Sequence, residues 1–498
     1  MIYTSTRDKN VRVSATEAIV KGISEDGGLF VPMTIPTLNL VDIEKLMRLD
    51  YIGRAKEILK LYLTDFSDEE LAMCVEGAYQ AQKFSSPKIA PLHKLNETAN
   101  VLELWRGPTC AFKDMALQLL PYLLTVSASK QLKDKKVVIL VATSGDTGKA
   151  ALEGFKDVPN TEIIVFYPVD GVSPMQKLQM TTQEGKNVHV CAIEGNFDDA
   201  QSGVKAIFGN RDIAAKCLEK DYVFSSANSI NWGRLVPQIV YYVSAYCDMV
   251  NQKTLRLGDS MNVVVPTGNF GNILAAYYAK QMGVPIGKLI CASNENNVLT
   301  EFLTTGHYNR KRPFHLTTSP SMDILISSNL ERLLFALTNQ DAEKTAAWMQ
   351  ELNKNGEYTV DEKTFEAVQE LFAAEYCDDE ETKRTIHKIY DSYAYLCDTH
   401  TAVAMHAFAV YCAKTADKTP TVIASTANPY KFSHSVLAAL KPALTVEDEF
   451  ETVEKLHEIS NMEIPRQLAT LKGKTPRFTE VSPKENMPQV VFSVLGIE

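Results

Sequence analysis

Short apolar runs alternate with amphipathic helices through most of the chain, and this alternation limits the fold more than any other feature. The run Lys136–Ala142 ends in a turn-forming segment that opens a helix at Lys149–Phe155, and Asn262–Val265 is followed in the same way by Ile273–Met282. The other runs with the composition of buried strands are Glu162–Tyr167, Val188–Ile193, Lys288–Ser293 and Thr421–Ser425. Strands that alternate with helices predict parallel sheets covered on both faces, and therefore an α/β fold.

The chain has 498 residues, which is enough for about three domains of ordinary size. Two α/β domains of unequal size account for the strands, and the remaining segments are mostly helical. We expect an N-terminal mostly helical segment (1–90), a large α/β domain (91–130 and 216–324, with 416–440), a smaller mobile α/β domain (131–215), a helical insertion (325–415) and a C-terminal tail (441–498).

Composition excludes several classes of protein. With 51 basic and 61 acidic residues the net charge is −10, and no basic cluster of the kind that binds nucleic acid is present. The nine cysteines form no CxxC pair, which favours reduced thiols in a cytoplasmic protein and no metal. The longest uncharged run, Ser260–Ala279, has Pro, Gly and Asn at its centre, so we expect no membrane span.

Two strand–loop–helix junctions are candidate anion sites. They are Ser144-Gly145-Asp146-Thr147-Gly148 and Gly268-Asn269-Phe270-Gly271-Asn272. Their glycines permit tight turns, and the helix that follows supplies free N–H groups and the positive end of its dipole. Neither matches a dinucleotide or P-loop fingerprint, which disfavours a nucleotide-dependent dehydrogenase. Taken singly, each junction is better explained as an ordinary turn between a strand and a helix.

Lys113 is a candidate nucleophile. It has apolar neighbours on both sides, near the start of a helix that we expect to run to Leu124. A lysine in an apolar pocket near a helix N-terminus loses its proton more easily than a free one, and Schiff-base chemistry requires the neutral amine. The alternative is an ordinary surface lysine on an amphipathic helix.

Two further segments contain side chains that could bind a ligand. Asn228–Arg234 places four polar groups that can bind an anion within seven residues, although a capped helix start explains it equally well. Ser425–Pro429 ends a strand with hydroxyl groups, where parallel-sheet proteins place ligand contacts. Together with Lys113 and the two loops, these segments are typical of a pyridoxal-phosphate enzyme, in which one loop holds the cofactor phosphate and the lysine its aldehyde.

At this level of detail the chain resembles the threonine synthases, and most closely their bacterial and fungal branch. These are pyridoxal 5′-phosphate enzymes of fold type II, the tryptophan-synthase-β type. The segments that carry the resemblance are Tyr3–Arg7, Glu25–Pro32, Gly107–Asp114, Ser144–Gly148, Pro266–Asn272, Ser319–Ile324 and Thr426–Phe432. One departure is Asn428, where histidine is common in the family.

The resemblance implies a role for each candidate residue. Lys113 would be the Schiff-base lysine and the catalytic base, and Thr426 would meet the pyridine nitrogen. Asp146 would lie near the phenolic oxygen of the cofactor. The cofactor phosphate would be held by Gly268, Asn269, Phe270, Gly271 and Asn272. The substrate would be bound by Ser144, Thr147, Asn228, Ser229 and Arg234, the last three at its phosphate.

The implied reaction converts O-phospho-L-homoserine and water into L-threonine and phosphate, which makes the protein a lyase of amino-acid biosynthesis. A phospholyase that releases 2-oxobutyrate, ammonia and phosphate from the same site is the alternative. A binding protein without activity is a further alternative, disfavoured by the presence of Lys113. We expect a small-molecule substrate and a monomer or homodimer.

Overall fold

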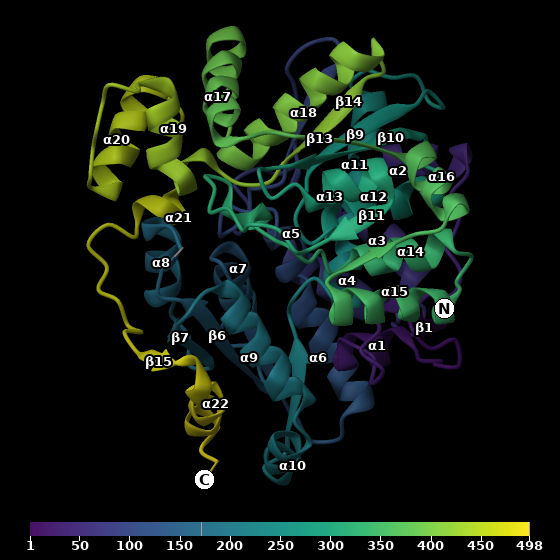
Figure 1. The fold of residues 1–498 in the computed structure, drawn as a ribbon, viewed down its shortest axis with the longest axis vertical. Helices are drawn as coiled ribbons and strands as arrows, with labels where there is room; N and C mark the ends of the chain where they lie inside the picture. Colours follow the sequence, from purple (N-terminus) through teal and green to yellow (C-terminus); the bar gives the residue numbers. More distant parts are fainter. Residues whose placement is uncertain (171, 498) are drawn as a thin grey trace.

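The computed structural model describes residues 1–170 and 172–497, and two sheets organise it (Figure 1). The larger sheet has the strand order β13-β10-β9-β14-β4-β3. Its strands are parallel except for the antiparallel pair β3 and β4. They are β3 (Leu92–Lys94), β4 (Ala99–Glu103), β9 (Met261–Pro266), β10 (Ile286–Ser293), β13 (Phe372–Tyr376) and β14 (Thr421–Ser425).

The smaller sheet has the order β15-β7-β6-β5-β8, and all of its strands are parallel. The inner strand β5 has the bounds predicted from the apolar run Lys136–Ala142, and every residue after Lys136 is buried. A parallel strand covered on both faces buries both sets of alternating side chains, so it requires a continuous apolar run. The strands are β5 (Lys136–Ala142), β6 (Thr161–Pro168), β7 (Val188–Glu194), β8 (Tyr222–Ser226) and β15 (Val481–Pro483).

Helices cover both faces of the larger sheet (Figure 1). Val263 and Val265 of β9 belong to the core that includes α11 (Trp232–Asn251) and α12 (Gly271–Gln281). Val264 points the other way, into the core formed with α18 (Thr399–Thr415). Successive side chains of a strand face opposite sides, so this split places the sheet between two helical layers. The α/β class predicted from the alternating pattern is therefore confirmed.

The smaller sheet has its own helices, and α7 and α9 pack directly on β5 and β6. The predicted helix 149–155 begins three residues earlier, because the glycine turn ends at Gly145 and α7 starts at Asp146. These helices are α7 (Asp146–Phe155), α8 (Pro174–Thr181), α9 (Phe197–Gly209) and α10 (Arg211–Glu219).

The N-terminal segment is mostly helical, as expected, and it also contributes a short antiparallel pair, β1 with β2. The helix expected from Lys113 to Leu124 is divided into α5 and α6, with a break at Gln118 and Leu119. The elements are β1 (Tyr3–Ser5), α1 (Ala15–Lys21), β2 (Phe30–Pro32), α2 (Leu40–Met47), α3 (Tyr51–Tyr62), α4 (Asp68–Ala78), α5 (Asp114–Leu117) and α6 (Leu120–Gln131).

The region 325–415 is largely helical, but it is more closely joined to the larger sheet than an insertion would be. β13 pairs with β10 at the sheet edge, and α18 packs on β9, β10, β13 and β14. With the preceding segment, the elements are α13 (Val298–Thr305), β11 (His307–Asn309), η1 (Pro320–Met322), α14 (Leu330–Leu337), α15 (Ala342–Asn355), β12 (Glu357–Thr359), α16 (Glu362–Leu371) and α17 (Asp379–Tyr393).

The smaller sheet also extends beyond the segment 131–215 that we assigned to it. β8 pairs with β5, and the C-terminal tail adds β15 beside β7. Both strands lie at a sheet edge, so the sequence that forms them carries no continuous apolar run. The last elements are η2 (Pro429–Phe432), α19 (Ser433–Leu440), α20 (Glu449–Ser460), α21 (Arg466–Ala469), η3 (Lys484–Asn486) and α22 (Met487–Leu495).

Three global features bear on the earlier expectations. Within residues 1–170 and 172–497, no helix is long and apolar enough to cross a membrane. The same residues contain no group of three or more His, Cys, Asp or Glu side chains placed to hold a metal ion. All nine cysteines are free thiols, and Cys412 is the one that is not fully buried.

Candidate active site

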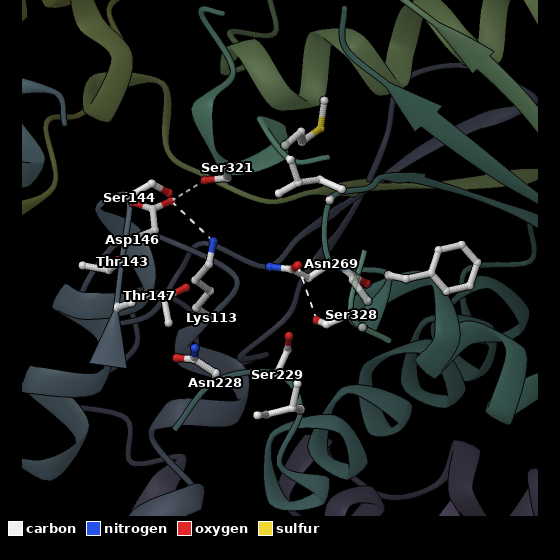
Figure 2. A pocket seen from close by; sticks show the side chains of 18 of the residues that line it. Lys113, Thr143, Ser144, Asp146, Thr147, Asn228, Ser229, Asn269, Ser321 and Ser328 are labelled. Carbon is white, nitrogen blue, oxygen red and sulfur yellow. Dashed lines mark hydrogen bonds and ion pairs between the residues drawn. The ribbon is translucent and has the colours of Figure 1, made fainter. Parts of the chain in front are cut away.

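All of the candidate site residues line one pocket, to which the loops of both sheets contribute. Figure 2 shows the Lys113 side chain pointing between Asp146 of the first loop and Asn269 of the second. The loops follow β5 and β9, at the carboxyl ends of these strands. This edge of an open parallel sheet is where helix N-termini converge and where ligands bind in such folds.

Lys113 is held against the end of β14. The Phe112 N–H donates to the Thr426 carbonyl at 2.8 Å, and Ala111 forms a β-bridge with Ala427. The Lys113 side chain is 12% exposed, and its Nζ lies 3.9 Å from Asp146 Oδ2. Burial, reinforced by the positive charge of Lys431, lowers the pKa of Lys113 to about 8 although Asp146 opposes the shift. The lysine is therefore largely buried, and its amine faces the charged Asp146 carboxylate.

Asp146 is the anion of the first loop. Its carboxylate accepts from Gln176 Nε2 at 2.8 Å and pairs with Lys431 Nζ at 2.5 Å. Burial alone would raise the pKa of Asp146, but the nearby Lys431 and Lys113 hold it well below its usual range. Gly145 makes this contact possible: its φ is +135°, and a Cβ there would lie 2.5 Å from the Gln176 side chain.

The second loop leads into α12 and has no such anion of its own. Phe270 adopts a left-handed conformation with φ of 62°, and no side chain caps the helix. The segment 327–329 supports the loop, because Ser327 Oγ donates to the Gly268 carbonyl at 2.7 Å and Asn329 Nδ2 to the Asn269 carbonyl at 2.9 Å. The first N–H groups of α12 are thus free to face the pocket.

Asn272 provides a direct test of whether this loop fits a phosphate group. Its Oδ1 accepts from the Tyr241 hydroxyl at 2.8 Å and also from Tyr242, whereas its Nδ2 is buried without a partner. A buried donor without a partner costs free energy unless a ligand satisfies it. Together with the uncapped helix N-terminus, this donor fits a phosphate group, and the second loop accordingly suits the cofactor phosphate.

Arg234 marks a second anion position in the same pocket. It lies in the first turn of α11, is 3% exposed, and has no carboxylate partner within residues 1–170 and 172–497. Its Nη1 donates to the Ala227 carbonyl, whereas its Nε is buried without a partner. Burial lowers the pKa of Arg234 to about 10, so it stays charged at neutral pH. The neighbouring Ser229 Oγ accepts from Asn329 Nδ2 at 3.1 Å.

Several residues of the site escaped the sequence analysis. Lys431 and Gln176 bind Asp146 from η2 and α8, and Ser321 Oγ lies 3.5 Å from it. His400 lines the pocket and accepts from the Ser321 N–H at 3.1 Å, with its other ring nitrogen 2.8 Å from Asp398. Lys431 lies in Thr426–Phe432, one of the segments that resemble the family. This resemblance was the one feature of the sequence that could have pointed to it.

Asn428, where the chain departs from the family pattern, does not line the pocket. Its Oδ1 accepts from the Tyr430 N–H at 3.0 Å, so it caps the short helix η2. Its Nδ2 is buried without a partner. The residue therefore shapes the segment between Thr426 and Lys431, and its backbone N–H donates to the Cys110 carbonyl at 3.0 Å.

Known families match nearly the whole chain. Residues 84–427 match the family described as pyridoxal-phosphate dependent enzyme, residues 2–79 the threonine synthase N terminus, and residues 401–491 the threonine synthase C-terminal region. Threonine synthase of Saccharomyces cerevisiae is 39% identical over 88% of this chain and 89% of its own length. Human threonine synthase-like 1 is 41% identical over 87% of this chain, which spans 59% of that longer protein.

The fold agrees with these relationships. The crystal structure of threonine synthase from Brucella melitensis with bound pyridoxal phosphate superposes with a TM-score of 0.87, at 35% identity over 99% of this chain and 98% of that one. A superposition of this extent confirms fold type II. The arrangement of the two sheets, with the pocket between them, is therefore one already known from a crystal structure.

Proposed function

This chain belongs to the threonine synthase family of pyridoxal-phosphate-dependent enzymes, and we propose that it converts O-phospho-L-homoserine and water into L-threonine and phosphate. One observation carries the proposal: a buried lysine lines the same pocket as an uncapped helix N-terminus and a buried arginine that has no carboxylate partner among the described residues. Such a pocket offers one amine and two anion positions, as a phosphorylated cofactor and a phosphorylated substrate require.

The second loop would hold the cofactor. Gly268, Asn269, Phe270, Gly271 and Asn272 would bind its phosphate, with the Asn272 amide supplying the donor that is now without a partner. Thr426 would meet the pyridine nitrogen with its hydroxyl group, and Asp146 would lie near the phenolic oxygen. When bound, pyridoxal 5′-phosphate supplies an aldehyde for an amine and a ring that accepts an electron pair.

The first loop and the start of α11 would bind the substrate. Arg234 would form charge-assisted hydrogen bonds with the substrate phosphate, since a buried guanidinium without a carboxylate partner favours an anion strongly. Asn228 and Ser229 line the pocket beside Arg234, and Ser144 and Thr147 line it at the first loop. These side chains would fix the substrate at both of its ends.

Lys113 would move the protons. With a pKa near 8, about a tenth of its amine is neutral at pH 7, enough to accept the proton of the substrate Cα. It would act again at Cβ, where water adds after phosphate has left Cγ. Arg234 would retain the leaving phosphate during this step, because its charge is buried.

We also propose that the part of the chain built on the smaller sheet closes over the bound substrate. The loop after β5 and helix α9 line the pocket from this side, opposite the loop after β9. Closure would exclude bulk water and direct the single water molecule that adds at Cβ. The family membership and the nine free thiols support a cytoplasmic enzyme, and a monomer or homodimer remains our prediction.

A product assay tests the proposal. Purified protein is incubated with pyridoxal 5′-phosphate and O-phospho-L-homoserine, and threonine, 2-oxobutyrate and phosphate are all quantified. We expect threonine and phosphate in equal amounts. Phosphate matched by 2-oxobutyrate would instead identify a phospholyase with the same pocket, and no release of phosphate would refute both activities.

A further inference from the structure

Lys431 is a fully buried charged side chain beside the pocket, with an exposed fraction of 0%. Its Nζ lies 2.5 Å from Asp146 Oδ1 and donates to the Thr109 carbonyl at 3.0 Å. It does not line the pocket itself. A buried ammonium group is costly unless it is closely paired, so this arrangement requires Asp146 to be ionised.

Two amines share the Asp146 carboxylate. Lys431 is at hydrogen-bond distance from Oδ1, whereas Lys113 Nζ lies 3.9 Å from Oδ2, beyond that distance. Gln176 and Ser321 contact the same carboxylate from α8 and η1. Lys431 is therefore the closer counter-ion of Asp146, and the ion pair between Asp146 and Lys113 is the looser of the two.

Backbone hydrogen bonds fix the segment that carries Lys431. Its backbone N–H donates to the Asn428 carbonyl at 3.0 Å, and Asn428 caps the short helix. The same segment contains Thr426, whose carbonyl accepts from the Phe112 N–H beside Lys113. One rigid segment thus positions both Lys431 and the backbone that presents Lys113.

We propose that Lys431 is a positioning residue that fixes and neutralises the Asp146 carboxylate, so that the Lys113 amine is free to lose its proton. This inference rests on the proposed function for the role of Lys113, although its test does not. Without the positive charge of Lys431, Lys113 would be the nearest positive charge to the Asp146 carboxylate. An opposite charge stabilises the protonated amine. The neutral fraction of Lys113 at a given pH would then fall.

Other charged and titratable groups surround this pair. Asp114 accepts from the Thr109 N–H at 2.8 Å and from its hydroxyl group at 2.7 Å. Arg234 faces Lys113 from α11, and Cys110 and Lys149 lie near the same cluster. His400 reaches the pocket from α18 and is held by Asp398. None of these groups changes in the substitutions below, so their effects on Lys113 stay constant.

The test measures the protonation of Lys113 directly in the full-length chain without cofactor. Trace acetic anhydride acylates neutral amines, and mass spectrometry of the peptide that contains Lys113 gives the labelled fraction as a function of pH. In Lys431→Met we expect the labelling midpoint to rise by about one pH unit, which is about a tenfold lower labelling rate at pH 7. Lys431→Arg keeps the charge and should leave the midpoint close to that of the unmodified chain.

Two further variants separate this role from a merely structural one. Lys431→Met combined with Asp146→Asn removes the unpaired carboxylate and should bring the midpoint back down. Lys280→Met is the matched control, because Lys280 is a partly buried lysine at the far end of α12 that donates to backbone carbonyls. It should leave the Lys113 midpoint unchanged.

An unchanged midpoint in Lys431→Met would overturn the inference. If Lys431→Met does not fold, the double variant decides. A labelling midpoint of Lys113 that is higher in the double variant than in the unmodified chain would also overturn the inference. Because the labelling needs neither cofactor nor substrate, a failure to form threonine would count against the proposed function and leave this result unaffected.

Discussion

Both loops of the pocket are glycine-containing junctions between a strand and a helix, but the chain places a buried carboxylate at only one of them. At α7 the first helical residue is Asp146, and Thr143 Oγ1 accepts from the Gly145 and Gly148 N–H groups at 2.9 and 2.8 Å. At α12 no side chain caps the helix, and the Asn272 amide has a buried donor without a partner. The two junctions therefore differ in the charge that the chain itself brings to the pocket, a carboxylate at α7 and an amide donor at α12.

The largest expected effect comes from the amine between the two loops. Lys113→Ala should lower the turnover rate by about 10³-fold or more, because proton transfer by a positioned base contributes about 10²–10⁴-fold and the link to the cofactor is also lost. The measurement is threonine formation under saturating cofactor. Since the α12 loop remains intact, the variant should still bind pyridoxal 5′-phosphate reversibly in equilibrium dialysis, and complete loss of binding would contradict the assignment of that loop.

Asp146→Asn removes the anion that the chain supplies at α7. It leaves the buried Lys431 ammonium without its carboxylate, and breaking such a pair costs about 3–5 kcal/mol. Urea denaturation followed by circular dichroism measures the loss of unfolding free energy. Asp199→Asn is a suitable control, because Asp199 pairs with the exposed Lys484 near the start of α9 and should matter far less. Equal losses in the two variants would argue against a buried pair at α7.

The lowered pKa of Lys113 predicts a dependence of stability on pH. Its pKa is about 8 in the folded chain and about 10.5 when unfolded, so between these values the unfolded state binds more protons and stability rises with pH. Relative to Lys113→Met, the unmodified chain without cofactor should gain on the order of 2–3 kcal/mol from pH 7 to pH 10. The measurement is the difference in unfolding free energy between the two chains, and a constant difference would refute the shift.

The smallest effect concerns the donor at α12. Asn272→Ala removes the Nδ2 group that has no partner in the protein, and a lost hydrogen bond to a phosphate group is worth about 1.5–3 kcal/mol. The dissociation constant for pyridoxal 5′-phosphate should therefore rise by about 10- to 100-fold in a fluorescence titration. Ser328→Ala is the control, since its hydroxyl contacts Asn269 only at 3.4 Å. No change in Asn272→Ala would mean that the amide does not face the cofactor.

The sequence predicted those parts of the fold that depend on local pattern. β5 and β9 were found because a central parallel strand must be apolar on both faces. β13 and β15 were missed because each lies at a sheet edge and is only partly buried. β4 is fully buried but contains Asn100 and Glu103, which concealed it.

The site residues also divide into those that a local sequence pattern reveals and those that only the structure reveals. Both loops and Lys113 were identified because glycines and a lysine among apolar residues are visible locally. Gln176 and Lys431 could not be found in this way, because they reach Asp146 from elements distant in sequence. The difference between the two junctions also depends on such contacts. The sequence indicated two similar anion sites, whereas in the structure Asp146 is paired with Lys431 at one junction and the Asn272 amide has a buried donor without a partner among the described residues at the other.

The most direct test of this account asks which of the two amines on Asp146 links the cofactor. The full-length chain is incubated with pyridoxal 5′-phosphate, reduced with borohydride and digested, and the modified peptide is identified by mass spectrometry. The account predicts a single modified lysine, Lys113, which lines the pocket beside the open α12 loop. Modification of Lys431 in place of Lys113 would contradict it, because Lys431 would then have to leave its buried pair with Asp146.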